Sequence, residues 1–198
     1  MSEKNKEIAG KKEKTSFGAE AFDWLQSIIA AFVAGLFIFV FVARVVRVDG
    51  SSMYKTLHNN DLVITSQLFY TPQVGDIIVF RTEETREEPL VKRVIAKAGQ
   101  TVDIDFDEGV VYVDGKALDE PYVNTPTNIR ENFTGEVTVP EGCLFVMGDN
   151  RNASRDSRSY SVGFVDERQI VGKVVLLLVP GSNENEKADW KRFGSVYR

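Results

Sequence analysis

The chain is organised around the stretch Val48-Asp-Gly-Ser-Ser-Met-Tyr-Lys-Thr-Leu57, which follows a long apolar run and precedes a series of short β-rich segments. It places two serine hydroxyls and a flexible glycine between two very different parts of the chain. A serine hydroxyl is a poor nucleophile at neutral pH unless a base takes its proton, so this stretch is catalytic only if another segment supplies that base. Two later segments are suited to complete the site, residues 88–96 and 148–158.

The composition excludes several classes of protein. A chain of 198 residues can hold one membrane segment and one globular domain of ordinary size. The net charge of −5 argues against a nucleic-acid binder, which needs a basic face to displace counterions. Cys143 is the only cysteine and His58 the only histidine, so the sequence predicts neither a Cys/His zinc site nor an intramolecular disulfide. We expect no metal and no cofactor.

The apolar run of residues 24–43 predicts a transmembrane helix. Its only polar side chains are Gln26 and Ser27, and about 20 helical residues span the roughly 30 Å hydrocarbon core of a bilayer. The run continues directly into Arg44 without a small-residue cleavage site, which favours an uncleaved anchor over a cleaved signal peptide or a buried core helix. The charged residues 1–23 predict a disordered tail.

Positive charges are balanced at the two ends of this run. Three Lys or Arg residues lie within about fifteen residues on each side. Including Lys4 and Lys6 weakly favours a cytoplasmic amino terminus. The large carboxy-terminal domain would then be extracytoplasmic, in a single-pass protein of the cell membrane.

After the apolar run the pattern changes to short, closely spaced segments rich in β-branched residues. Asp114-Gly115 predicts a two-residue hairpin turn, and residues 119–135 predict a long surface excursion. We therefore predict a mainly β domain over residues 44–180. The polar and aromatic tail, residues 181–198, is expected to be docked, frayed or laid on a membrane surface. The predicted strands are 62–65, 76–80, 90–96, 101–105, 110–113, 136–139, 144–147 and 170–179.

Lys92 is the candidate base. It lies in a strand-like run with aliphatic neighbours on both faces, among them Leu90 and Val94 on its own face. Burial disfavours the ammonium form, so the pKa of such a lysine falls and a neutral amine becomes available near neutral pH. The alternative readings are a solvated or ion-paired strand lysine for Lys92 and an ordinary turn serine for Ser52.

The segment Gly148–Arg158 mixes carboxylates, guanidinium groups and a serine, and could form a rigid ion-paired turn. A surface loop of self-cancelling charges is the alternative. The segment lacks the Gly-Lys-Ser/Thr ending of a phosphate-binding loop and the carboxylate spacing of a calcium loop.

Taken together, these segments resemble the type I signal peptidases, in particular the single-span bacterial kind. The motifs that carry the resemblance occur in the family's order and are Asp49–Leu57 after the transmembrane run, Gly75–Phe80, Val91–Ile95 and Met147–Arg158. The resemblance covers about residues 24–180. It implies a β-rich catalytic fold with a small inserted lobe, which we match to about residues 100–142.

The resemblance also implies roles for individual residues. Ser52 is the nucleophile of a Ser/Lys dyad and Lys92 is its general base. Ser154 holds the lysine amine in place, and Asp156 and Arg158 form a supporting ion pair.

Further residues are implied around the nucleophile. The Ser52 backbone N–H binds the oxyanion with help from Gly50, which lacks the hydroxyl found in the family's other version. One departure is Lys55, where the family has a proline that would fix the backbone φ. The implied substrate-binding residues are Asp49, Met53, Leu57, Pro89, Leu90 and Val91.

We therefore expect a membrane-bound serine endopeptidase that removes signal peptides from exported preproteins, cleaving after a small residue in an Ala-x-Ala pattern. Its expected partners are preproteins, the lipid bilayer and the secretion translocon. A second hypothesis is a non-catalytic, membrane-anchored assembly factor for surface structures. A third is a Ser/His/Asp hydrolase using His58, although the run His-Asn-Asn-Asp is typical of a turn. The apolar run and the lack of a helix-turn-helix disfavour a self-cleaving repressor.

Overall fold

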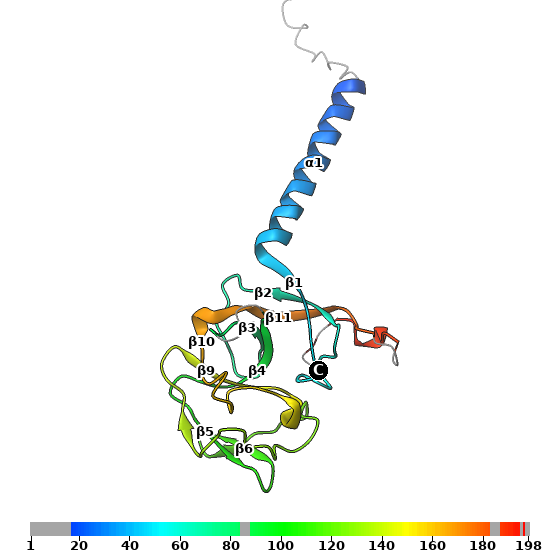
Figure 1. Cartoon of the computed structure of the whole chain (residues 1–198). Helices are drawn as coiled ribbons and strands as arrows, with labels where there is room; N and C mark the ends of the chain where they lie inside the picture. Colours follow the sequence, from blue (N-terminus) through cyan, green and yellow to red (C-terminus); the bar gives the residue numbers. More distant parts are fainter. Residues whose placement is uncertain (1–16, 84–87, 183–186, 195, 197–198) are drawn as a thin grey trace, which may run out of the picture. The chain divides into compact units, whose positions relative to one another are not determined.

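The computed structural model describes residues 17–83, 88–182, 187–194 and 196. The chain divides into two compact units, Met1–Phe41 and Val42–Arg198. The first contains one long helix, and the second contains all the strands (Figure 1).

Helix α1 (Phe17–Val42) has 26 residues and is about 39 Å long at 1.5 Å per residue. Its window Glu20–Phe37 has a mean hydropathy of 1.3. Large apolar side chains along it are exposed, including Trp24 at 70% and Phe32 at 71%. The helix begins before the predicted start, so residues 17–23 are helical rather than part of a disordered tail, because the alanines and the glutamate of this segment favour a helix. The rest of the predicted tail lies outside the described residues.

The second unit is built on a seven-stranded sheet with the order β1-β2-β11-β3-β4-β9-β10, in which neighbouring strands are antiparallel. The strands are β1 (Ala43–Arg47), β2 (Leu62–Ser66), β3 (Ile77–Phe80), β4 (Leu90–Lys97), β9 (Cys143–Met147), β10 (Val165–Asp166) and β11 (Ile170–Val179). Three short 3₁₀ helices accompany them, η1 (Arg151–Ala153), η2 (Glu167–Gln169) and η3 (Trp190–Arg192).

A second sheet of four strands, with the order β7-β6-β5-β8, is inserted in the chain between β4 and β9. Its strands are β5 (Thr101–Asp105), β6 (Val110–Val113), β7 (Lys116–Ala117) and β8 (Val137–Thr138). In Figure 1, β5 and β6 lie at the end of this unit away from β1, β2 and β11. This sheet falls within the segment that we predicted as the inserted lobe.

The predicted fold class, mainly β with one N-terminal apolar helix, is confirmed. The hairpin at Asp114-Gly115 is also confirmed, because both residues have positive φ (51° and 71°) and join β6 to β7. Two strands were missed. β1 follows the apolar run without a break in hydrophobicity and becomes a strand by pairing with β2, while β10 has two residues and is too short to show a period.

Strand β4 lies between β3 and β9, and its residues 91–96 are all buried. Val91 packs in one core cluster with Met53 and Leu57, and Val94 packs in another with Ile78. The third cluster joins the lobe to the large sheet. A lysine in the middle of β4 is therefore surrounded by packed apolar side chains.

Candidate active site

Ser52 lies on the Ser52 loop, which we define as residues 48–61 between β1 and β2. Backbone hydrogen bonds from Val48 N–H to Asp61 O at 2.8 Å and from Asn60 N–H to Val48 O at 2.9 Å close the loop at its base. Met53 and Leu57 are 1% and 0% exposed. These two apolar anchors hold the middle of the loop against the sheet and leave the half-buried Ser52 at its surface.

Lys92 reaches Ser52 from strand β4. Its Nζ lies 2.8 Å from Ser52 Oγ and donates a second hydrogen bond to Val91 O at 2.9 Å. The residue is 2% exposed. Burial lowers the pKa of Lys92 to about 8, although the nearby Asp156 carboxylate raises it, and Arg155 and Asp149 have smaller opposing effects. The predicted nucleophile and base, 40 residues apart in sequence, are thus in direct contact.

Ser154 is buried, and its hydroxyl has no hydrogen-bond partner among the described residues. It lies beside Gly148, where a Cβ would come within 2.3 Å of Ser154 Oγ and 2.5 Å of Ser52 O. A glycine is therefore required for this close approach. The predicted hydrogen bond from the Lys92 amine to Ser154 is absent from the described contacts, although Ser154 is brought close to Ser52.

Asp156 and Arg158 form the predicted ion pair, and both are buried. Arg158 Nε and Nη2 each lie 2.9 Å from an Asp156 oxygen, and the carboxylate also accepts the Gly148 N–H at 3.0 Å. Arg158 further donates to Ile129 O at 2.7 Å and to Arg151 O at 2.6 Å. A buried ion pair with its remaining hydrogen bonds satisfied fixes the geometry of the segment that carries Ser154.

The segment Gly148–Arg158 also contacts the Ser52 loop directly. Asn150 donates its backbone N–H to Ser52 O at 2.9 Å and its side-chain amide to Ser51 O at 3.1 Å. Both peptide carbonyls next to the Ser52 hydroxyl are thereby held in place.

Sequence reasoning missed an ion pair between Arg93 and Asp149. Arg93 Nε and Nη2 lie 2.8 Å and 2.6 Å from the two oxygens of this buried carboxylate. Thr56 of the Ser52 loop donates to the same carboxylate, and Tyr122 packs its ring 3.9 Å from the Arg93 guanidinium carbon. Arg151 similarly pairs outside its segment, with Glu120. The sequence shows that these residues are charged, but it does not show which of them pair, because the partners are 56 and 31 residues apart in the chain.

The two predicted oxyanion donors differ in their contacts. No acceptor for the Ser52 N–H lies within hydrogen-bond distance in the described part of the chain. The Gly50 N–H, in contrast, donates to Asn59 Oδ1 at 2.8 Å. The amide of Gly50 is therefore already engaged in this structure.

The residues predicted to bind substrate do not form one group. Met53, Leu57 and Val91 share a core cluster, whereas Leu90 packs against the cluster of Ile78, Phe80 and Val94. Asp49 is exposed and Pro89 half-buried. The structure thus separates Leu90 from Met53 and Leu57, because successive side chains of β4 point to opposite faces of the sheet.

His58 contributes to a turn rather than to a catalytic triad. Its backbone N–H donates to Asp61 Oδ2 at 2.7 Å, and its ring lies 4.9 Å from the Tyr54 ring. Ser52 Oγ is bonded to Lys92 instead. Among the residues that the structure describes, no group of three or more His, Cys, Asp or Glu side chains is placed to hold a metal ion.

Comparisons with known proteins identify relatives of this chain. The family model for signal peptidase, peptidase S26, matches residues 21–179. Signal peptidase I of Bacillus caldolyticus is 40% identical over 167 residues, which are 76% of this chain and 86% of that protein. Signal peptidase I S of Bacillus subtilis (strain 168) is 35% identical over 190 residues, which are 90% and 100% of the two chains. A solved signal peptidase I from Enterococcus faecalis V583 is 34% identical, with a TM-score of 0.43 over 54% of this chain and 98% of that one.

The family match covers most of the chain, and together with these relatives it defines the class of protein: the chain is an enzyme, a serine endopeptidase. More particularly, it belongs to the signal peptidase family, peptidase S26, whose members compared above are signal peptidases I. The resemblance found in the sequence is confirmed. Removal of signal peptides is the activity that this membership supports.

Proposed function

We propose that the enzyme cleaves signal peptides from exported preproteins with Ser52 as nucleophile and Lys92 as general base. The observation that carries this proposal is the 2.8 Å contact between Lys92 Nζ and Ser52 Oγ at a buried lysine. In the ammonium form the lysine donates this hydrogen bond. Once the amine is neutral, its lone pair accepts the Ser52 proton across the same distance.

The lowered pKa makes this base available at physiological pH. With a pKa of about 8, about one tenth of the Lys92 amines are neutral at pH 7. At the ordinary value of 10.5 the neutral fraction would be about 300-fold smaller. Burial in β4 therefore supplies a base that an exposed lysine cannot.

The reaction then proceeds in two stages. Lys92 takes the proton as Ser52 Oγ attacks the scissile carbonyl carbon, and the resulting oxyanion accepts the Ser52 N–H. The Lys92 ammonium returns its proton to the leaving amine, so the C–N bond breaks and an ester to Ser52 remains. Lys92 then takes a proton from a water molecule, which attacks the ester carbon. As the C–O bond to Ser52 breaks, Lys92 returns this proton to Ser52 Oγ, and the acid product is released.

Ser154 is proposed to orient the Lys92 amine during these steps. Its buried hydroxyl lacks a partner in the described structure, and an unsatisfied buried hydroxyl costs about 1 to 3 kcal/mol. Accepting an N–H of Lys92 would remove this cost and direct the lysine lone pair at Ser52. The Asp156–Arg158 pair supports Ser154 by fixing its segment.

Cleavage is proposed to follow a small residue, in the Ala-x-Ala pattern. Met53 and Leu57, which follow the nucleophile in the Ser52 loop, are packed in the core. A closely packed apolar wall accepts a methyl group and clashes with larger side chains.

Helix α1 is proposed to anchor the enzyme in the cell membrane, with a cytoplasmic amino terminus and residues 44–180 outside as the peptidase domain, close to the secretion translocon. The exposed apolar side chains of the helix support an environment of lipid. Ser52 is ten residues beyond Val42, the last residue of α1, so at about 3.3 Å per residue the connecting chain spans at most roughly 33 Å. Leu68 and Phe69, 53% and 96% exposed, are proposed to contact the bilayer surface.

The proposal is tested by incubating the detergent-solubilised protein with a preprotein that carries an Ala-x-Ala site. The wild type is expected to release the mature protein with the predicted new amino terminus, and Ser52→Ala to release none. Equal cleavage by Ser52→Ala would reject Ser52 as the nucleophile. A preprotein with phenylalanine before the cut should resist cleavage, and its efficient processing would reject the proposed specificity.

A further inference from the structure

The end of the chain docks onto the peptidase domain. We call residues 189–194 the C-terminal strap; it contains η3 and is joined to β11 by two backbone hydrogen bonds between Leu177 and Gly194, at 2.7 Å and 3.1 Å. The family match ends at residue 179, so the strap lies beyond the segment that defines the family. Just after it, Val196 is 8% exposed and packs in the core cluster that contains Met53 and Leu57.

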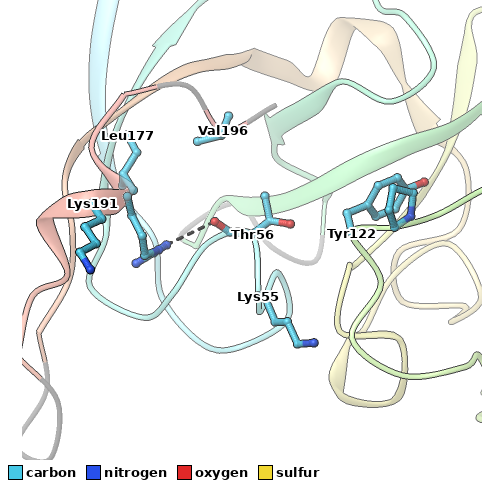
Figure 2. A pocket seen from close by; sticks show the side chains of 8 residues that line it. Lys55, Thr56, Tyr122, Leu177, Lys191 and Val196 are labelled. Atoms are coloured by element: carbon cyan, nitrogen blue, oxygen red, sulfur yellow. Dashed lines mark hydrogen bonds between the residues drawn. The ribbon is translucent and has the colours of Figure 1, made fainter. Parts of the chain in front are cut away.

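Arg192 carries the polar contacts between the strap and the Ser52 loop. Its guanidinium binds the Asp61 carboxylate with both terminal nitrogens, at 3.1 Å and 2.6 Å. One of these nitrogens also donates to Thr56 O at 3.3 Å, the contact drawn as a dashed line in Figure 2. A single side chain thus holds the middle and the end of the loop.

Asp61 is a fully buried carboxylate that collects several donors. It accepts the His58 N–H at 2.7 Å and the Gly181 N–H at 2.6 Å in addition to Arg192. Removing one partner of a buried ion pair is strongly unfavourable, because the other charge is left without compensation. Arg192 therefore compensates the charge of Asp61, alongside the two backbone N–H donors, at the point where backbone hydrogen bonds close the Ser52 loop.

Behind the loop, the strap does not fill all the space. A pocket of about 300 Å³ lies where the loop and the strap meet, lined by Lys55 and Thr56 of the loop, Lys191 of the strap, and Tyr122 (Figure 2). The hydrogen bond from Arg192 to Thr56 O joins the strap to the loop at this pocket.

We propose that Arg192 is a positioning residue for the peptidase reaction. By holding Thr56 O and Asp61, it keeps Ser52 Oγ at hydrogen-bond distance from Lys92 Nζ. This inference rests on the function proposed for Ser52 and Lys92. A displacement of about 1 Å between reacting groups lowers a rate by about a hundredfold, so a loosened loop is expected to lower kcat.

The test compares Arg192→Ala and Arg192→Lys with the wild type in the full-length, detergent-solubilised enzyme. Arg192→Ala is expected to lower kcat by about ten- to a hundredfold with little change in KM. It should leave the pH midpoint of kcat/KM unchanged, because the pKa of Lys92 is lowered chiefly by its burial in β4, which does not involve Arg192. Arg192→Lys keeps a cation for Asp61 but cannot reach Thr56 O at the same time. It should melt near the wild-type temperature and recover part of the activity.

Arg168→Ala is the matched control, because it breaks a pair between the exposed Arg168 of η2 and the half-buried Asp166 at the end of β10. It should keep wild-type kcat. The assays are run well below the melting temperature of each variant. A loss of activity then reflects the position of the Ser52 loop rather than unfolding. A wild-type kcat in Arg192→Ala, or a loss that only follows its unfolded fraction, overturns the inference. If Ser52→Ala retains activity, the proposed function fails instead, so the two failures are distinguishable.

Discussion

Replacing Lys92 by arginine is the most direct test of the proposed base. Arginine keeps a positive charge at the position but stays protonated at every accessible pH, so it cannot accept the Ser52 proton. In the wild type about half of the Lys92 amines are neutral at pH 8. Loss of general-base catalysis typically lowers rates by about 10²- to 10⁴-fold, and by more where nucleophile and base act as a unit.

We therefore expect Lys92→Arg and Lys92→Met to lose at least about a hundredfold in kcat/KM on a preprotein at pH 8. Methionine fills the apolar site without a charge, so Lys92→Met should melt at or above the wild-type temperature. The losses should equal that of Ser52→Ala and should not add to it in the double variant.

Lys173→Arg is the control for this substitution. Lys173 forms a structural ion pair with Asp76 at 2.6 Å on the same sheet, and arginine can make the same pair. It should retain full activity. If Lys92→Arg retains more than about a tenth of wild-type kcat/KM while folded, Lys92 is a structural cation and the Ser/Lys mechanism is refuted.

Four further outcomes are expected. The kcat/KM of the wild type should rise about tenfold per pH unit below pH 8 and level off above it, since deprotonation of Lys92 creates the base; a rate that falls over pH 6–8 contradicts this assignment. Ser154→Ala should lower kcat by about tenfold without lowering the melting temperature, and wild-type kcat would remove its orienting role. Gly148→Ala should lower kcat by about ten- to a hundredfold, because its Cβ would clash with Ser52 O, whereas Gly35→Ala meets open space and should be neutral. Phe69→Ser should weaken the stimulation of cleavage by phospholipid vesicles without changing activity in detergent, and unchanged stimulation would reject the proposed bilayer contact.

The sequence indicated the architecture well where the signal is local. The short segments rich in β-branched residues predicted β2, β4 and β11, and the Asp-Gly pair predicted the hairpin at residues 114–115, because strand and turn preferences depend on neighbouring residues. Ser52 and Lys92 were named by resemblance, since each by itself has a common structural explanation. Strand β1 was not predicted, because its apolar residues directly continue the apolar run of the preceding helix.

What the tertiary structure alone decided is the set of partners. Three contacts join residues that only the sheet and its loops bring together. They are the ion pair of Arg93 with Asp149, the hydrogen bond from the Gly50 amide to Asn59, and the ion pair of Arg192 with Asp61. A charge in the sequence shows that a partner is needed, but its identity depends on which strands are adjacent and how far each loop returns. The sequence therefore determined the strands and the reactive groups, whereas the order of the strands determined the buried position that lowers the pKa of Lys92 and places it against Ser52.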